Sequence, residues 1–289
     1  MMTDVVSLMR IGQWVKNIFV FLPLFFSGKI VLFEYWLPTI VSFVAFSLAA
    51  SSIYALNDVV DAEADRNHPQ KRCRPIAAGN LTPRTGLTIC VICALCAFMV
   101  AAFVNSYVMV VVVLYLLLDV AYCLWLKRIA ILDVLIVAVG FVLRLLAGGW
   151  ATAIHLSQWI VMMTFLLALF LVVAKRRDDV LIYERQGTVS RDTVYGYNLP
   201  FVNQVMCVVA AIMIVCYIMY TVSPEVTLRL HTNRLYLTTL FVIAGVMRYM
   251  QLTLVEAKSS SPTKILLNDR FVQLCVIGWF VSFMMIIYL

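Results

Sequence analysis

The sequence predicts an all-α integral membrane protein with nine transmembrane helices. Of its 289 residues, 64% are hydrophobic and 13% are charged, and the mean hydropathy is +0.98. This apolar fraction far exceeds that of a soluble globular domain. Apolar stretches recur from end to end, and no polar segment between them is large enough to fold alone. We therefore expect residues 1–289 to form a single transmembrane domain.

Windows of about 20 apolar residues, the length that crosses a bilayer, give the nine predicted spans. They cover residues 14–28, 35–57, 84–104, 107–126, 130–151, 156–174, 200–222, 234–252 and 271–289. The first span is the shortest. The segment before it, MMTDVVSLMR, lacks the small-residue cleavage site of a signal peptide, so we expect an uncleaved anchor.

The basic residues predict the orientation of the spans, because Lys and Arg concentrate in short cytoplasmic loops. With the N-terminus inside, all but four of the 22 Lys and Arg residues fall on the inner side. The exceptions are Lys29, Arg144, Arg229 and Arg234. We therefore expect a cytoplasmic N-terminus and an external C-terminus. The net charge of +7 then reflects topology, and we expect no nucleic-acid partner.

Asn57 to Gly79, NDVVDAEADRNHPQKRCRPIAAG, is the most charged segment between two spans. Asn57, Asp58, Asp61 and Asp65 are spaced i, i+1, i+4 and i+8, so they share one face if the preceding helix continues through them. Like charges that close repel each other unless a cation lies between them. Mg²⁺ fits, because it binds through one or two carboxylates and completes its shell with water and phosphate oxygens.

Basic residues follow these acids and complete the predicted site. Four of them would face the remaining phosphate charge: Arg66, Lys71, Arg72 and Arg74. The alternative is an ordinary cytoplasmic loop whose acids compensate its bases. The helical spacing of the aspartates favours a Mg²⁺–diphosphate site at the membrane surface.

A second charged run, AKRRDDVLIYERQG, follows the sixth predicted span. Its three cations alone would be a stop-transfer cluster, but the adjacent carboxylates suit a second metal or a clamp on phosphate and metal. We predict Asp179 as a metal ligand. Lys175, Arg176 and Asp178 are predicted substrate contacts, and the number of metal ions stays open.

Further candidates for substrate binding lie near the same predicted membrane face: Gln13, Lys16, Asn17, Tyr122 and Lys127. Lys16 could instead extend to the lipid headgroups, and Lys127 could be a topology signal. Arg144 differs because it lies mid-span, where a charge costs about 2.5–3.5 kcal/mol. Such residues face a polar cavity or a partner. Arg144 either binds an anionic substrate group or pairs with Asp119.

The N-D-x-x-D-x-x-x-D pattern of residues 57–65 resembles that of the UbiA superfamily of intramembrane prenyltransferases. Five segments are similar to its bacterial decaprenyl-phosphate phosphoribosyltransferase branch: QWVKN at 13–17, residues 57–79, AYCLWLK at 121–127, LRLLAGGWAT at 143–152 and AKRRDD at 174–179. The run HPxKRxRPIAAG, residues 68–79, is the most specific part. This resemblance implies nine helices around a central cavity that opens to the cytoplasm, in a bacterial inner membrane.

The resemblance also implies an activity. Enzymes of this branch transfer 5-phosphoribosyl from phosphoribosyl diphosphate to a polyprenyl phosphate in the bilayer and release diphosphate. Asp58, Asp61 and Asp65 would hold Mg²⁺ as the catalytic carboxylates, with Asn57 assisting. Lys71, Arg72 and Arg74 would neutralise the leaving group. Lys16, Lys127, Lys175 and Arg176 would bind the other phosphates.

Two other functions compete with this expectation. A prenyltransferase would move a polyprenyl group from its diphosphate to an aromatic or other small acceptor. An anion transporter would need polar groups on both sides of the membrane, whereas the charge here is one-sided. A homo-oligomer is left open, because Gly148 and Gly149 permit close helix contact either within the chain or between chains.

Overall fold

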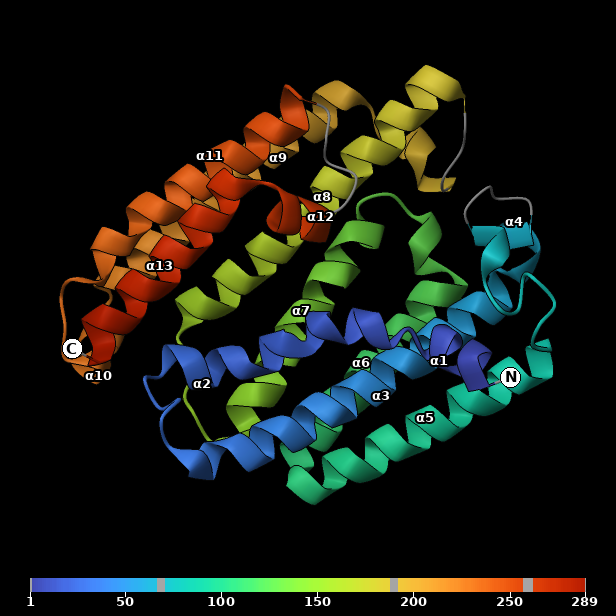
Figure 1. Ribbon diagram of the computed structural model, residues 1–289, viewed down its shortest axis with the longest axis horizontal. Helices are drawn as coiled ribbons and strands as arrows, with labels where there is room; N and C mark the ends of the chain where they lie inside the picture. Colours follow the sequence, from blue (N-terminus) through green and yellow to red (C-terminus); the bar gives the residue numbers. More distant parts are fainter. Residues whose placement is uncertain (1, 67–70, 188–191, 257–261, 289) are drawn as a thin grey trace. The chain divides into compact units, whose positions relative to one another are not determined.

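The computed structural model describes residues 2–66, 71–187, 192–256 and 262–288, and within these ranges every regular element is a helix (Figure 1). The all-α prediction is confirmed. Over the same ranges, nine helical spans are long and apolar enough to cross a membrane, which agrees with the nine predicted ones. The chain is a multi-pass membrane protein.

The elements, with η for 3₁₀ helices, follow in chain order. They are α1 (Met2–Met9), η1 (Ile11–Phe21), α2 (Leu22–Phe26), η2 (Phe33–Tyr35), α3 (Trp36–Val60), α4 (Ala62–Arg66), η3 (Lys71–Cys73), α5 (Pro83–Val104), α6 (Ser106–Leu124), η4 (Leu126–Arg128), α7 (Leu132–Ala151), α8 (Gln158–Gln186), η5 (Asp192–Gly196), α9 (Leu199–Val222), α10 (Pro224–Leu230), η6 (Leu235–Thr238), α11 (Thr239–Leu254), α12 (Pro262–Asn268) and α13 (Arg270–Tyr288).

Two spans differ from their predicted limits. The first runs over Thr3–Phe26, because α1, η1 and α2 follow one another almost without interruption. The sixth was predicted to end at residue 174, but α8 continues to Gln186. Its extension is rich in Lys, Arg, Leu, Glu and Gln, which favour helix. Gly187 then ends it with φ 66°, the left-handed conformation that glycine supplies at helix ends. The run KRRDD is therefore helical, and its placement in a loop was wrong.

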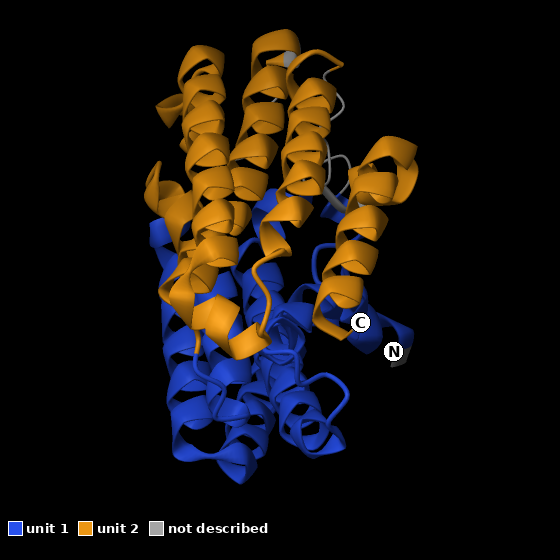
Figure 2. Ribbon diagram, turned by 90° about the vertical axis from the view of Figure 1, so that its left-hand side faces the viewer, with its two compact units in different colours: residues 1–127, 140–155 blue, residues 128–139, 156–289 orange. Residues whose placement is uncertain are grey.

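The described chain divides into two compact units (Figure 2). Unit 1 comprises residues 1–127 and 140–155, and unit 2 comprises residues 128–139 and 156–289. The expectation of one membrane domain stays a prediction.

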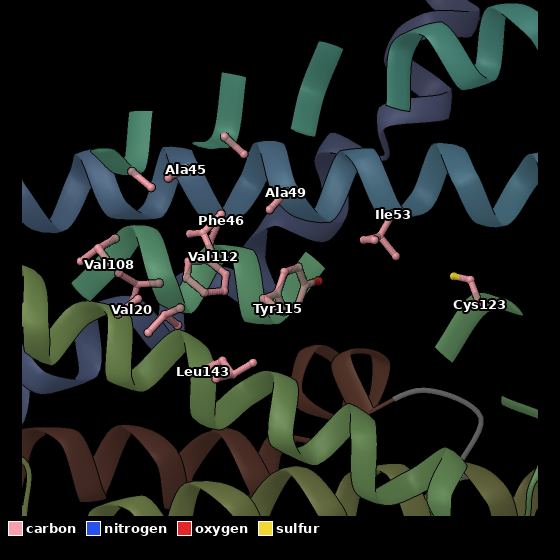
Figure 3. Close-up of a cluster of buried hydrophobic side chains, with 14 residues drawn as sticks. Val20, Ala45, Phe46, Ala49, Ile53, Val108, Val112, Tyr115, Cys123 and Leu143 are labelled. Carbon is pink, nitrogen blue, oxygen red and sulfur yellow. The ribbon is translucent and has the colours of Figure 1, made fainter. Parts of the chain in front are cut away.

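In unit 1, α3 packs against α5, α6 and η1. Small residues such as Ala45 and Ala49 are fully buried on α3, which allows its neighbours to approach closely. Between them, the rings of Phe46 and Tyr115 lie 5.2 Å apart at the centre of the core (Figure 3). This close packing fixes the position of the end of α3, where the predicted site begins.

The segment η1 also lies tightly against α7. A Cβ added to Gly148 would overlap the backbone carbonyl of Val20 and would lie 3.2 Å from Pro23 Cδ. Glycine is thus needed at this position for the backbone of η1 to reach the helix. The contact of Gly148 is internal to the chain.

In unit 2, α8 packs against α9, and α11 packs against α13. Its most buried ionic group is Asp133 at the start of α7, which has no exposed surface. Asp133 accepts hydrogen bonds from Arg176 Nε at 2.6 Å and from the Tyr197 hydroxyl at 2.6 Å. Burial, and then the bond to Asp133, raise the pKa of the Tyr197 phenol well above its usual value. The phenol therefore remains a donor, and Asp133 ties α7 to α8 and to the segment after η5.

Replacing Gly148 by Ala should lower the free energy of unfolding by roughly 1–3 kcal/mol, because the added methyl group overpacks the contact with Val20. Thermal unfolding in detergent micelles measures the change. Gly245→Ala is the matched control, since its Cβ would meet Cys275 at an ordinary 3.5 Å. Equal stability of the two variants would contradict the close approach of η1 and α7.

Replacing Asp133 by Ala should cost about 3–5 kcal/mol, because it leaves the buried Arg176 charge without its buried partner. Asp269→Ala, which removes a helix cap and a partly exposed ion pair with Arg248, should cost only about 1–2 kcal/mol. Chemical denaturation of both variants in the same detergent compares them. A loss for Asp133→Ala no larger than that for Asp269→Ala would rule out this role of Asp133.

Candidate functional site

The predicted acidic residues lie where α3 gives way to α4. Asp61 interrupts the two helices with φ −93° and ψ 5°, so the expectation of one continuous helix was wrong at this residue. The spacing nevertheless persists, because Asp61 N donates to Asn57 O and Asp65 N donates to Asp61 O. Asp58 and Asp65 share one cation, whereas Asp61 pairs with a different one. We call Asn57, Asp58, Asp61 and Asp65 the acidic centre.

Asp58 and Asp65 converge on one guanidinium nitrogen. Arg74 Nη1 lies 2.6 Å from Asp65 Oδ2 and 3.2 Å from Asp58 Oδ1. The two carboxylate side chains are only 2% and 4% exposed. Since a buried carboxylate without a partner costs several kcal/mol, the shared cation offsets the cost of burying both.

Arg10 is a second cation that contacts Asp58. It forms an ion pair with Asp58 Oδ1, and its guanidinium carbon lies 5.0 Å from the centre of the Tyr54 ring. Sequence reasoning counted Arg10 only as a topology signal, because 48 residues separate it from Asp58. Its position directly before QWVKN was the one available clue.

The third aspartate has a different cation. Lys127 Nζ lies 2.5 Å from Asp61 Oδ1, and these side chains are 14% and 30% exposed. Asn57 Oδ1 accepts a weak hydrogen bond from Cys123 Sγ at 3.7 Å. Lys127 thus lies beside the acidic centre through its ion pair with Asp61, and its contact with a substrate phosphate stays a prediction.

The acidic centre suits a divalent cation by its donor chemistry. Two carboxylate oxygens already converge on one positively charged atom, and hard oxygen donors are what Mg²⁺ prefers. In the ranges that the structure describes, no three His, Cys, Asp or Glu side chains form a group that could hold a metal. Two carboxylates are nevertheless enough for Mg²⁺ when substrate phosphate and water supply the other ligands.

The remaining predicted residues of the first loop lie near these side chains in sequence. Arg66 on α4 and Arg72 on η3 are exposed, whereas Lys71 is half-buried. His68, Pro69 and Gln70, from the specific run HPxKRxRPIAAG, fall outside the described residues. On α6, Tyr122 is half-buried.

The three candidates on η1 differ in how exposed they are. Gln13 and Lys16 are exposed, but Asn17 is only 1% exposed. Asn17 Nδ2 donates to Ser47 Oγ at 3.0 Å, and Asn17 Oδ1 accepts from Arg144 Nε at 2.7 Å. Asn17 therefore contacts the interior of unit 1.

Arg144 has neutral hydrogen-bond partners within unit 1. Besides Asn17, it donates to Gly140 O at 2.7 Å and to the Tyr115 hydroxyl at 3.0 Å. The same hydroxyl interacts with Asp119, so Tyr115 links the two charged residues. The structure thus differs from a direct Arg144–Asp119 pair: Tyr115 lies between the two residues, and Asp119 compensates the charge of Arg144 through it.

In unit 2 the predicted residues lie along α8. Arg176 is buried and bridges Asp133 and Asp179, with Nη1 at 2.7 Å from Asp179 Oδ2. Lys175 is exposed, and Asp178 and Asp179 are half-buried. Asp179 therefore forms an ion pair with Arg176, three residues before it on the same helix.

Curated relatives match almost the whole chain. The decaprenyl-phosphate phosphoribosyltransferase of Mycolicibacterium smegmatis is 33% identical over 290 residues, which cover 96% of this chain and 91% of the relative. The protein of the same name from Corynebacterium glutamicum is 30% identical and covers 98% of this chain and 86% of the relative.

Solved structures share the fold. A UbiA homologue from Archaeoglobus fulgidus, solved with GPP and Mg²⁺, superposes with a TM-score of 0.72 at 15% identity and covers 99% of this chain and 100% of that one. The family model described as the UbiA prenyltransferase family matches residues 18–281. Together with the curated relatives, this match shows that the chain belongs to the UbiA prenyltransferase family.

Proposed function

We propose that this protein transfers a 5-phosphoribosyl group from phosphoribosyl diphosphate to a polyprenyl phosphate, with Mg²⁺ as its cofactor. The observation that carries the proposal is the convergence of Asp58 and Asp65 on Arg74, with Arg10 beside them. A departing diphosphate requires carboxylates that can hold a divalent cation and guanidinium groups beside them that can bind its oxygens. The names of the curated relatives support the same transfer and suggest decaprenyl phosphate as the acceptor.

The reaction breaks the bond between the anomeric carbon of ribose and the diphosphate, and forms a bond from that carbon to a phosphate oxygen of the lipid. The lipid phosphate is ionised near neutral pH, so no general base is needed. Mg²⁺, when bound, would neutralise the developing charge on the diphosphate. Asp58 and Asp65 would hold the metal, with Asp61 and Asn57 next to them.

The cations that pair with the acidic centre would bind the leaving group. Arg10 and Arg74 can each offer a planar pair of N–H donors to phosphate oxygens. Arg66, Lys71 and Arg72 would add positive charge on the same side, and Lys127 would contact a phosphate beside Asp61. Lys175, Arg176, Asp178 and Asp179 remain our candidates for the second charged region. Tyr122 remains a candidate contact to substrate.

We further propose that the acidic centre faces the cytoplasm, where the soluble donor is available, with the N-terminus on the same side and the C-terminus outside. The concentration of Lys and Arg in the predicted inner segments supports this orientation. The acceptor would remain in the bilayer, and residues 1–289 would act as one membrane domain.

Asp58→Asn and Asp65→Asn should each lower kcat/KM for phosphoribosyl transfer by about a hundredfold or more, equivalent to about 2.7 kcal/mol of transition-state stabilisation. The assay follows labelled phosphoribosyl diphosphate into lipid with purified protein, Mg²⁺ and decaprenyl phosphate. Glu34→Gln is the control, since Glu34 is an exposed carboxylate on η2.

A wild-type protein that forms no lipid-linked ribose phosphate would refute the proposed function. Formation of a prenylated small acceptor from a polyprenyl diphosphate would point to prenyl transfer. Full activity of either Asn variant would remove that residue from the metal site.

Arg10→Ala and Arg74→Ala should each lower kcat/KM for phosphoribosyl diphosphate by about tenfold or more, because each removes a charged donor to the diphosphate. Arg10→Lys should recover part of the loss, since it keeps the charge without the planar fork. Arg84→Ala, which removes an exposed arginine on α5, is the control. Equal losses in the control and in the Arg10 variant would show that only overall charge matters.

A further inference from the structure

The segment η1 has an unusual conformation that its own sequence does not explain. It is a 3₁₀ helix of 11 residues, Ile11–Phe21, whereas 3₁₀ runs longer than about three or four residues are uncommon. It begins after Arg10, whose φ of 51° and ψ of 50° lie in the left-handed region. Contacts with other elements must therefore stabilise it.

One face of η1 makes these contacts with α3, beside which it runs in Figure 1. Trp14 Nε1 donates to Ser51 Oγ at 3.0 Å, and Asn17 Nδ2 donates to Ser47 Oγ at 3.0 Å. Ser51 Oγ also donates to Met9 O at 2.9 Å. We call Trp14, Asn17, Ser47 and Ser51 the serine ladder.

The spacing of the ladder matches the rise of a 3₁₀ helix. Three residues of a 3₁₀ helix advance by about 6 Å, and four residues of an α-helix advance by about 6 Å as well. Trp14 and Asn17 are three residues apart, and their partners on α3 are four apart, so the two spacings match. In an α-helical η1, these two side chains would be about 4.5 Å apart along the axis and turned by about 60° from one another. An α-helical η1 would therefore match the spacing of the two serines less closely than the 3₁₀ helix does.

Arg144 and Gly148 hold the same segment from the side of α7. Arg144 Nε donates to Asn17 Oδ1 at 2.7 Å, which fixes the orientation of the amide that also bonds Ser47. Gly148 leaves room for the carbonyl of Val20, three residues beyond Asn17. The register of η1 is thus set by two helices.

This register also places a second row of side chains. Residues three apart eclipse in a 3₁₀ helix, so Gln13 and Lys16 line up on an exposed face. Their row starts at Arg10, whose carbonyl accepts from Gln13 N at 2.7 Å and whose guanidinium pairs with Asp58. The backbone of Lys16 lies two turns, about 12 Å along the axis, beyond that of Arg10, which places Lys16 to meet a phosphate group apart from one held at Arg10.

We propose that the serine ladder, with Arg144, positions Gln13 and Lys16 to bind a phosphate group other than the leaving diphosphate. The ladder residues are positioning residues that need not touch the substrate. The inference rests on the proposed function for the identity of the phosphate, which is either the 5-phosphate of the donor or the phosphate of the lipid acceptor.

The double variant Ser47→Ala/Ser51→Ala tests the ladder, and Ser42→Ala is its matched control. Ser42 lies on the same helix, is equally buried, and its Oγ has no hydrogen-bond partner among the described residues. Hydrogen exchange of the backbone amides of residues 11–21, measured in detergent, should become at least about tenfold faster in the double variant. It should stay unchanged in Ser42→Ala. Unchanged hydrogen exchange in the double variant would contradict the claim that the serine ladder stabilises η1.

A kinetic cycle with Lys16→Ala tests the positioning role. With Lys16 unchanged, Ser47→Ala/Ser51→Ala should raise the KM for one phosphate substrate by about fivefold or more, the size expected for lost hydrogen bonds. It should change kcat by less than about twofold. In the Lys16→Ala background it should have no further effect. A KM change for phosphoribosyl diphosphate identifies the donor phosphate, and one for polyprenyl phosphate identifies the acceptor.

Equal losses in both backgrounds would overturn the positioning role and leave the ladder as a packing feature. A wild-type protein that makes no product overturns the proposed function, and the exchange measurement still decides whether the ladder sets the conformation of η1.

Discussion

The ionic contacts of Asp58 constrain much of unit 1. This carboxylate is buried at the end of a membrane helix, where a charge without a partner costs several kcal/mol. Arg10 and Arg74 supply the charge, one from the segment before η1 and the other from the loop after α4. Because Arg74 also binds Asp65, the loop returns to the helix end. The path of the chain on both sides of α3 therefore depends on one pair of acids.

Two other buried charges, Arg144 and Asp133, have a different environment from the acidic centre. Arg144 is surrounded by an amide, a phenol and a carbonyl, and Asp133 by a phenol, a hydroxyl and a guanidinium. Donors and acceptors are matched in both groups, which is what allows polar groups to remain in an apolar interior. These groups join helices within a unit. The acidic centre instead pairs its carboxylates with cations, and we propose that a metal binds the same carboxylates.

Much of the fold could be predicted from the sequence, because bilayer thickness imposes a length on every span. The nine apolar windows needed no knowledge of packing. The continuation of α8 to Gln186 was missed because charge was taken to end the helix, although Gly187 marks its true end. The break at Asp61 was also missed, since spacing alone cannot tell a continuous helix from two helices that share a hydrogen-bond pattern.

The candidate site was predictable where its residues are close in sequence. Asp58, Asp65 and Arg74 all fall in the charged segment 57–79, and the structure brings their side chains together. Arg10 and the role of Asn17 were not predictable, because their partners lie 48 and 30 residues away. The 3₁₀ conformation of η1 could not be foreseen either, since it depends on the spacing of two serines on another helix.

Binding of Mn²⁺ in place of Mg²⁺, followed by electron paramagnetic resonance in the presence of phosphoribosyl diphosphate, tests the central claim most directly. The account predicts that wild-type protein and Glu34→Gln bind the ion, and that Asp58→Asn and Asp65→Asn each lose most of this binding. Undiminished Mn²⁺ binding in both Asn variants would contradict it, and the acidic centre would then be a purely structural group of ion pairs.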